Sequence, residues 1–208
     1  MDQAWVYAPV LIVSFFLMVP FVIIAETKYK MKQVFLSAIA LFGLSQLGFI
    51  FLGSHISAVV ISLIIFFTAF VLLEATLPSL VSKLAPISSK GTALGVYSSC
   101  QFFGAFVGGS VGGFLYGEHH ISGVYIFCLA LALIWFLLAI SMEKPAQVAT
   151  RMISIKKIEN NKKAQMIESE LLKVKGVRQA KIIISDNIAY LKVDSKILNE
   201  DDLLKFAS

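Results

Sequence analysis

The carboxylate of Glu74 is the group in this sequence whose type and position most strongly indicate chemistry. It is the only Asp or Glu inside the apolar stretches of a chain that is 58% hydrophobic and 15% charged. A charge at the centre of a bilayer costs about 2.5–3.5 kcal/mol on insertion scales. We therefore expect Glu74 to face a bundle interior or a wet cavity, where it can take up and release a proton. A structural pairing with Lys83 or a loop amide is the alternative.

Further polar side chains interrupt the apolar stretches, namely Ser45, Gln46, Ser98, Ser99 and Gln101. Their hydrogen-bonding groups suit the lining of a substrate cavity, for which Gln46, Ser98 and Gln101 are the candidates. Ser and Gln also bond across helices merely to hold a bundle together. Both interpretations stay open at this point.

Glycines recur at every fourth position in one apolar stretch, residues 92–116. The overlapping series consist of Gly104, Gly108 and Gly112, with Gly109 and Gly113 beside them. Small residues at this spacing let another helix approach the backbone closely. The pattern predicts tight helix packing rather than catalysis.

Signatures of enzymatic chemistry are missing from the sequence. There is no Gly-rich phosphate loop and no Ser/His/Asp pattern, and Cys100 and Cys128 lie in apolar stretches. His119 and His120 stand beside Glu118 with no further ligand nearby, too few for a typical metal site. We expect no enzyme activity, no cofactor and no metal.

Five apolar segments hold these residues, each long enough for a helix to cross a bilayer, which takes about 20 residues. The segments are residues 5–25, 33–52, 58–81, 92–116 and 123–141. Residues 1–142 contain only five of the 18 basic and four of the 13 acidic side chains. This predicts an all-α membrane bundle of five transmembrane helices that contacts the lipid bilayer and no nucleic acid.

Basic residues mark one side of the predicted bundle. They follow the first and the third segments, as Lys28, Lys30, Lys32, Lys83 and Lys90, whereas the loops after the second and fourth segments carry none. Lys and Arg beside a span stay on the cytoplasmic side. We expect the amino terminus outside and the carboxy-terminal region in the cytoplasm.

A linker at residues 143–149 leads to residues 150–208, which we expect to form a small α+β domain. β-rich runs and helical periodicity give the order β-α-β-β-α, in residues 152–158, 160–174, 178–184, 188–193 and from 199 onward. This order is that of a ferredoxin-like motif whose final strand is missing from the sequence. The apolar stripe of the first helix should pack on the hairpin, bringing together Ala164, Ile167, Leu171, Val174, Ala180, Ile182, Ile184, Ala189, Leu191 and Val193.

Two stretches of sequence resemble a known transporter family. The run SSKGTALGVY at residues 88–97, continued by QFFGAFVGGSVGG at residues 101–113, resembles the eleventh span of Major Facilitator Superfamily transporters. The run EATLPSL at residues 74–80 is similar to the preceding span. Five spans followed by a ferredoxin-like domain further resemble the YajR-like group of that superfamily.

The resemblance implies spans eight to twelve of a twelve-span, proton-coupled antiporter that exports a small solute or drug. Glu26, Lys28 and Lys30 would then occupy the place of the family's acid-plus-basic cytoplasmic gating motif. Only the acid and the lysines match, because the glycine and arginine positions of the stronger copy of that motif are absent here.

Spans one to seven of such a transporter have no counterpart in this sequence. We therefore expect a truncated chain, inactive alone, that needs the missing amino-terminal half to handle solute and protons in a bacterial inner membrane. The alternative is a membrane anchor for a cytoplasmic binding or regulatory module. In either case the carboxy-terminal domain offers a surface for self-association.

Overall fold

The computed structural model of this chain describes residues 4–143, 148–155, 160–184, 187–194, 197–198 and 203. Two compact units make up the chain. One comprises Met1–Leu80 with Val96–Lys144, and the other comprises Val81–Gly95 with Pro145–Ser208. The first unit is helical, whereas the second holds a small sheet. The predicted division into residues 1–142 and 150–208 remains a prediction.

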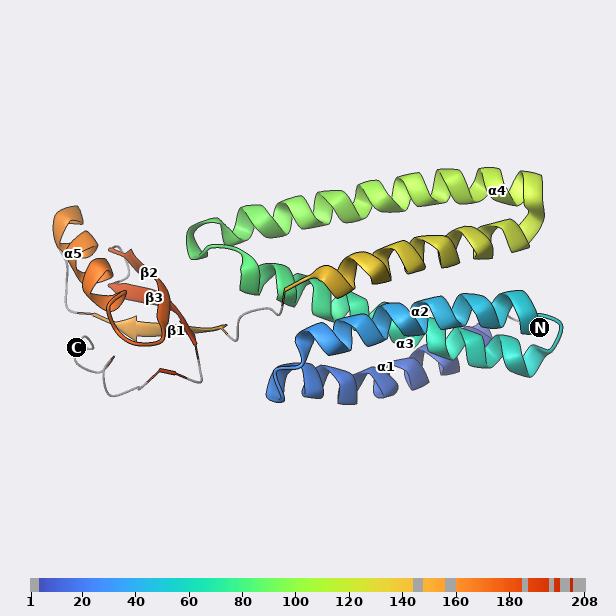
Figure 1. The fold of residues 1–208 in the computed structure, drawn as a ribbon, viewed down its shortest axis with the longest axis horizontal. Coiled ribbons are helices and arrows are strands. Elements are labelled where there is room, and N and C mark those ends of the chain that lie inside the picture. The colour runs from blue at the N-terminus through green and yellow to red at the C-terminus, as the bar shows by residue number, and fades with distance from the viewer. Residues whose placement is uncertain are drawn as a thin grey trace. The chain divides into compact units, whose positions relative to one another are not determined.

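Four long helices carry the apolar part of the described chain (Figure 1). They are α1 (Ala4–Thr27), α2 (Met31–Leu52), α3 (Ile56–Leu84) and α4 (Lys90–Ser141), with a short 3-10 turn, η1 (Ile87–Ser89), before the last. All four are long and apolar enough to cross a bilayer. Segments of this composition can leave water as helices because a helix satisfies its backbone polar groups internally.

Helix α4 contains two of the five predicted spans as two arms on either side of a kink, and the predicted number of five transmembrane helices remains a prediction. It is 52 residues long, and His120 within it has non-helical dihedral angles, φ 56° and ψ −164°. Figure 1 shows the ribbon reversing direction between the two arms of α4. The sequence suggested a loop at residues 117–122. The loop is absent because a single residue outside the helical region is enough to reverse the chain.

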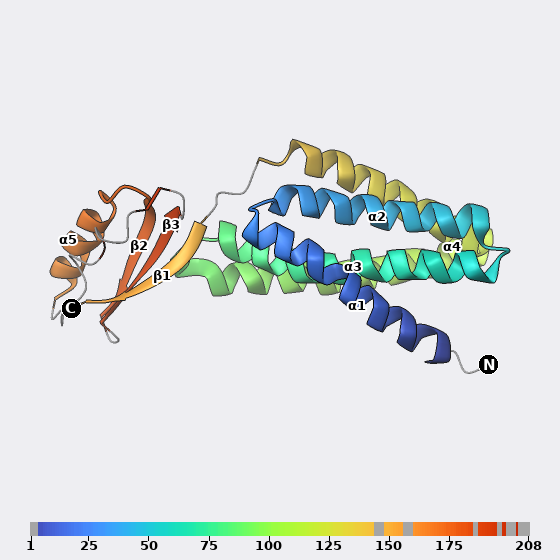
Figure 2. The same ribbon diagram turned by 90° about the horizontal axis from the view of Figure 1, so that it is seen from below.

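Aromatic and polar contacts between helices hold the helical unit together, and Figure 2 shows α1 crossing α3. Leu72 of α3 is fully buried in the core. Phe35 of α2 meets Trp135 of α4 edge to face, with ring centroids 5.7 Å apart. Ser14 of α1 donates its hydroxyl hydrogen to the carbonyl oxygen of Ile64 in α3, at 3.1 Å.

A close contact between α2 and α3 lies at Gly48 and Ser62. A Cβ atom placed on Gly48 would overlap the side chain of Ser62. Within the described residues, Cβ atoms on the predicted glycine ridge of α4 would meet no atom within 4 Å, which holds for Gly104, Gly108, Gly109, Gly112 and Gly113. The structure thus shows a tight glycine contact outside the ridge, and helix packing at the ridge stays a prediction.

The second unit contains, among its described residues, a three-stranded antiparallel sheet in the order β1-β3-β2. Its elements are β1 (Val148–Ser154), α5 (Asn161–Leu171), β2 (Val177–Ile183) and β3 (Ile188–Asp194). The central strand β3 pairs with all of β1, from Val148 opposite Asp194 to Ser154 opposite Ile188. This pairing corrects the first strand, predicted at residues 152–158, because its register with β3 places it four residues earlier.

The predicted packing of α5 on the sheet is confirmed. One core contains Ala164, Ile167, Leu171, Val174, Ala180, Ile182, Ile184, Ala189, Leu191 and Val193. Gly176 makes the turn after α5 with φ 99°, where a Cβ atom would come within 2.8 Å of the Leu198 backbone nitrogen. The predicted last helix lies outside the described residues except for Leu203, so the ferredoxin-like topology remains a prediction.

We expect Gly48→Leu to destabilise the helical unit by about 1–3 kcal/mol, because the larger side chain cannot fit against Ser62. Gly108→Leu is the matched control, since a side chain there meets no described atom within 4 Å. The measurement is thermal unfolding of the whole chain in detergent. Equal losses of stability in both variants would contradict the structure and place a helix against the ridge.

Candidate functional site

The structure brings the predicted proton-coupling residue, Glu74, together with one predicted cavity-lining residue, Gln101. The Nε2 of Gln101 in α4 donates to Oε1 of Glu74 in α3, at 2.7 Å. Both side chains are exposed on the helical unit. A side-chain amide on a neighbouring helix is therefore one partner of Glu74, and the alternative pairing with Lys83 or a loop amide stays open.

The helical period of α3 explains why Glu74 lies on the surface of the unit. Leu72, Thr76 and Leu80 are buried and recur every fourth residue, which places them on one face of the helix. Glu74 lies two residues from Leu72 and from Thr76, about 200° around the helix axis at 3.6 residues per turn. Burial of the apolar face thus turns the carboxylate away from the core of this unit.

The other two predicted cavity-lining residues, Gln46 and Ser98, differ in their surroundings. Gln46 is 3% exposed, and its Nε2 donates to Oγ of Ser45 on the same helix, at 3.2 Å. Ser98 is exposed on α4, three residues before Gln101 and so on the same face. Gln46 lies inside the bundle, while Ser98 lies near the Glu74–Gln101 pair. Cavity lining remains a prediction for both.

The predicted gate residues lie around the connection between α1 and α2. The hydroxyl of Ser79 in α3 donates to Oε1 of Glu26 at the end of α1, at 3.3 Å. Lys28 and Lys30 are exposed. The acid of the predicted motif therefore links the ends of two helices, and a gating role for the three residues remains a prediction.

Lys32 makes a contact that the sequence analysis missed. Its Nζ donates to the carbonyl oxygen of Ile140 at 2.7 Å and also to that of Met142, both at the end of α4. The last carbonyls of a helix lack intrahelical partners and carry partial negative charge, so an ammonium group stabilises them. This contact could not be predicted from the sequence because the partners of Lys32 lie 108 and 110 positions away.

Lys192 of β3 makes the corresponding contact within the second unit. It is only 5% exposed, and its Nζ donates to the carbonyl oxygen of Lys83 at 2.8 Å and to that of Ala85. These carbonyls lie at the end of α3. The sequence predicted Lys192 as a residue of a β-strand and assigned it no role.

The described residues form no cluster of three or more His, Cys, Asp or Glu that could hold a metal ion. Cys100 and Cys128 are free thiols. The site contains a carboxylate, that of Glu74, which lies beside the amide donor of Gln101. A carboxylate in this position is a group that can bind a proton.

The sequence pattern of the Major Facilitator Superfamily matches residues 2–185. The chain is 36% identical to the inner membrane transport protein YajR of Escherichia coli strain K12 over 198 residues, which cover 95% of the chain and 43% of that protein. It is 31% identical over 136 residues to an uncharacterized transporter of Buchnera aphidicola subsp. Baizongia pistaciae, covering 65% of the chain and 34% of that transporter. The chain spans less than half the length of these relatives.

We expect Lys32→Met to destabilise the helical unit by about 1–2 kcal/mol, because the α4 carbonyls lose a charged donor. Lys28→Met is the control, since Lys28 is exposed and such a surface change usually costs less than about 0.5 kcal/mol. Thermal unfolding of the whole chain in detergent measures both. Indistinguishable melting temperatures for the two variants would show that the cap on α4 contributes nothing.

Proposed function

The chain belongs to the Major Facilitator Superfamily, and from this premise we propose that it forms part of a secondary active transporter that exports a small solute in exchange for protons. Family membership makes it part of a membrane transporter rather than an enzyme. The proton role is supported by one observation above all. The hydrogen bond from Gln101 to Glu74 joins α3 and α4 through a carboxylate in the middle of an apolar helix.

Proton binding at Glu74 changes which hydrogen bonds the pair can form. An ionised carboxylate only accepts, so it takes the N–H of Gln101, whereas a protonated carboxyl group can also donate to the Gln101 carbonyl oxygen. Protonation further removes a charge that costs about 2.5–3.5 kcal/mol at a bilayer centre. The two protonation states therefore favour different arrangements of α3 and α4, which is what coupling to a solute requires.

The remaining predicted residues have places in this proposal. Ser98 and Gln101 line the solute path beside Glu74, with Gln46 contributing from the bundle. Glu26, Lys28 and Lys30 gate one end of the helices. The glycine ridge of α4, which contains Gly108, contacts helices that lie outside this chain.

We further propose that the amino terminus lies outside an inner membrane and the sheet lies in the cytoplasm. The support is the one-sided placement of lysines near the helix ends, such as Lys28 and Lys83. The two arms of α4 then cross the bilayer separately, which gives five crossings. The name of the Escherichia coli relative, an inner membrane transport protein, agrees with this location.

Transport is proposed for the whole transporter. This chain contributes the helices described above to it. A membrane-anchored binding module is the second candidate, favoured by the Lys192 contacts that hold the sheet to the end of α3. Co-expression with the amino-terminal part of the Escherichia coli relative, followed by assays of proton-driven dye efflux, separates the two. Efflux that survives deletion of residues 150–208 supports the transporter, and its absence in every combination supports the module.

We expect Glu74 to bind a proton reversibly in the bilayer. Infrared difference spectra of the whole chain in phosphatidylcholine nanodiscs, taken between high and low pH, should show the C=O band of a carboxylic acid in an apolar setting. Glu74→Gln should remove this band completely. Glu118→Gln is the control and should leave it, because Glu118 lies outside the apolar segments, near the reversal at His120. A band that persists in Glu74→Gln would contradict the proton role.

A further inference from the structure

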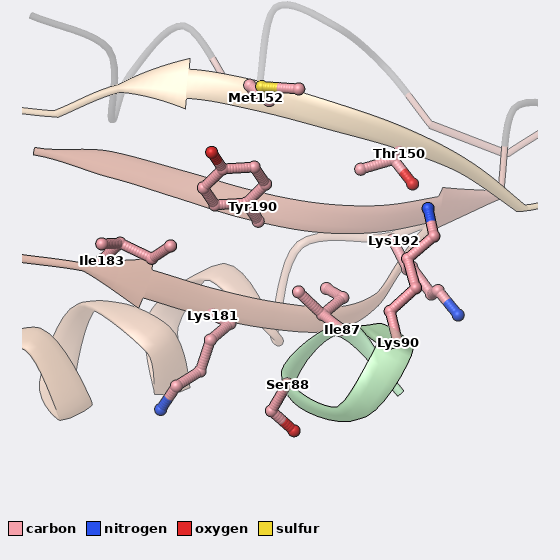
Figure 3. Close-up of a pocket in the computed structure, with 9 residues that line it drawn as sticks. All are labelled: Ile87, Ser88, Lys90, Thr150, Met152, Lys181, Ile183, Tyr190 and Lys192. Carbon is pink, nitrogen blue, oxygen red and sulfur yellow. The ribbon is translucent and has the colours of Figure 1, made fainter. Parts of the chain in front are cut away.

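A pocket lies on the face of the sheet that points away from α5. Ala189, Leu191 and Val193 of β3 belong to the core under α5. Alternation along a strand sends Tyr190 and Lys192 to the opposite face. There, between the sheet and the η1 turn, the structure has a cavity of about 500 Å³ (Figure 3). This volume is in the range of small-molecule sites, about 300–1,000 Å³.

Hydrogen bonds within the second unit hold both walls of the pocket. The η1 turn belongs to Val81–Gly95, which forms one compact unit with the sheet. The Ile87 backbone N–H donates to Oε1 of Gln179 in β2, at 3.3 Å. Lys192 donates to the carbonyl oxygens at the end of α3, as described above. The pocket therefore has a fixed frame rather than being a gap between loosely joined loops.

One end of the pocket is strongly basic. Lys90 and Lys192 extend toward this end, where Thr150 adds a hydroxyl group (Figure 3). The described residues of the lining include no Asp or Glu. Lys90 is also the first residue of α4, whose first turn has no acidic residue, so the positive pole of the helix adds to the two ammonium charges.

Among the described residues of the lining, backbone carbonyl oxygens but no carboxylate face the charges at this end. Lys181, the third lysine of the pocket, lies 3.5 Å from Oε1 of Glu168 and is balanced by it. The described partners of Lys192 are backbone carbonyl oxygens, and burial first, then the neighbouring charge of Lys90, lower the pKa of its ammonium group. An anion between Lys90 and Lys192 would relieve this repulsion.

The other end of the pocket is apolar. The Tyr190 ring lies in the middle, with Met152 and Ile183 on either side of it (Figure 3). Met152 is 64% exposed and Ile183 is 39% exposed. A flat aromatic group lying on Tyr190 would cover these side chains, since aromatic rings pair favourably by offset stacking.

We propose that this pocket binds an organic phosphate with an aromatic body, its phosphate between Lys90 and Lys192 and its ring on Tyr190. Two ammonium groups and the hydroxyl group of Thr150 offer more donors than a carboxylate needs, and they match the oxygens of a phosphate. The proposal goes beyond transport and does not depend on it. An occupied site would tie the segment between α3 and α4 to the sheet.

The test uses the whole chain in phosphatidylcholine nanodiscs and isothermal titration calorimetry with three probes. Adenosine monophosphate carries both the phosphate and the ring, adenosine carries the ring alone, and inorganic phosphate carries the anion alone. We expect adenosine monophosphate to bind at one site and at least about tenfold more tightly than either fragment, because one charge-assisted interaction is worth about that factor.

Variants assign the binding to this pocket. Lys90→Gln should weaken adenosine monophosphate about tenfold or more and leave adenosine unchanged, while Lys90→Arg should retain most of the affinity. Lys163→Gln is the matched control, because it removes one exposed lysine of α5 on the other side of the sheet. Circular dichroism of each variant checks that the second unit stays folded.

Nanodiscs that contain phosphatidylglycerol identify the source of the phosphate. Weaker binding of the nucleotide in these discs, abolished by Lys90→Gln, supports the same site occupied by an anionic lipid headgroup. Unchanged binding supports a soluble ligand. The proposal is overturned if adenosine monophosphate does not bind, if it binds no better than adenosine, or if Lys90→Gln binds it like the unmodified chain.

Discussion

A helix in hydrocarbon satisfies every backbone group except those at its ends, and the structure depends on how those ends are met. The last carbonyls of a helix need donors, and a lysine ammonium offers three with a full positive charge. Lys32 meets the end of α4, and Lys192 meets the end of α3. The first contact ties α2 to α4 within the helical unit. The second holds the sheet against the Val81–Gly95 segment and frames the basic pocket.

Hydrocarbon holds no water to hydrogen-bond with the polar side chains along the helices, so these side chains also need partners within the protein. Thr68 and Thr76 donate to carbonyl oxygens one turn earlier on α3, and so they need no partner from another helix. The Glu74–Gln101 bond differs because it joins two helices through side chains in mid-helix. Glu74 is an acid in an apolar helix, and its hydrogen-bond partner Gln101 lies on another helix rather than one turn away on its own. This difference is the structural basis on which the proton role is proposed for Glu74.

Features that depend on local periodicity could be predicted from the sequence, and features that depend on distant partners could not. The apolar helices and the stripe that contains Leu171 follow from repeats of a few residues. The position of β1 depends on its register with β3, about forty residues away, and so the prediction was displaced. The contacts of Lys32 and Lys192 depend on partners more than 100 positions away. Glycine spacing in α4 indicates that a helix can approach, but it does not say which helix does.

The reversal of α4 at His120 has a consequence for how this part of the protein reaches the membrane. Because one residue outside the helical region separates the arms, the hydrophilic chain that has to be carried through the bilayer between them is a short stretch around Glu118, His119 and His120. During synthesis the second arm follows the first with almost no chain between them, and the two arms can enter the bilayer together as a hairpin. An insertion of polar residues at this point would make insertion of the two arms into the membrane less favourable, even where it left the finished fold intact.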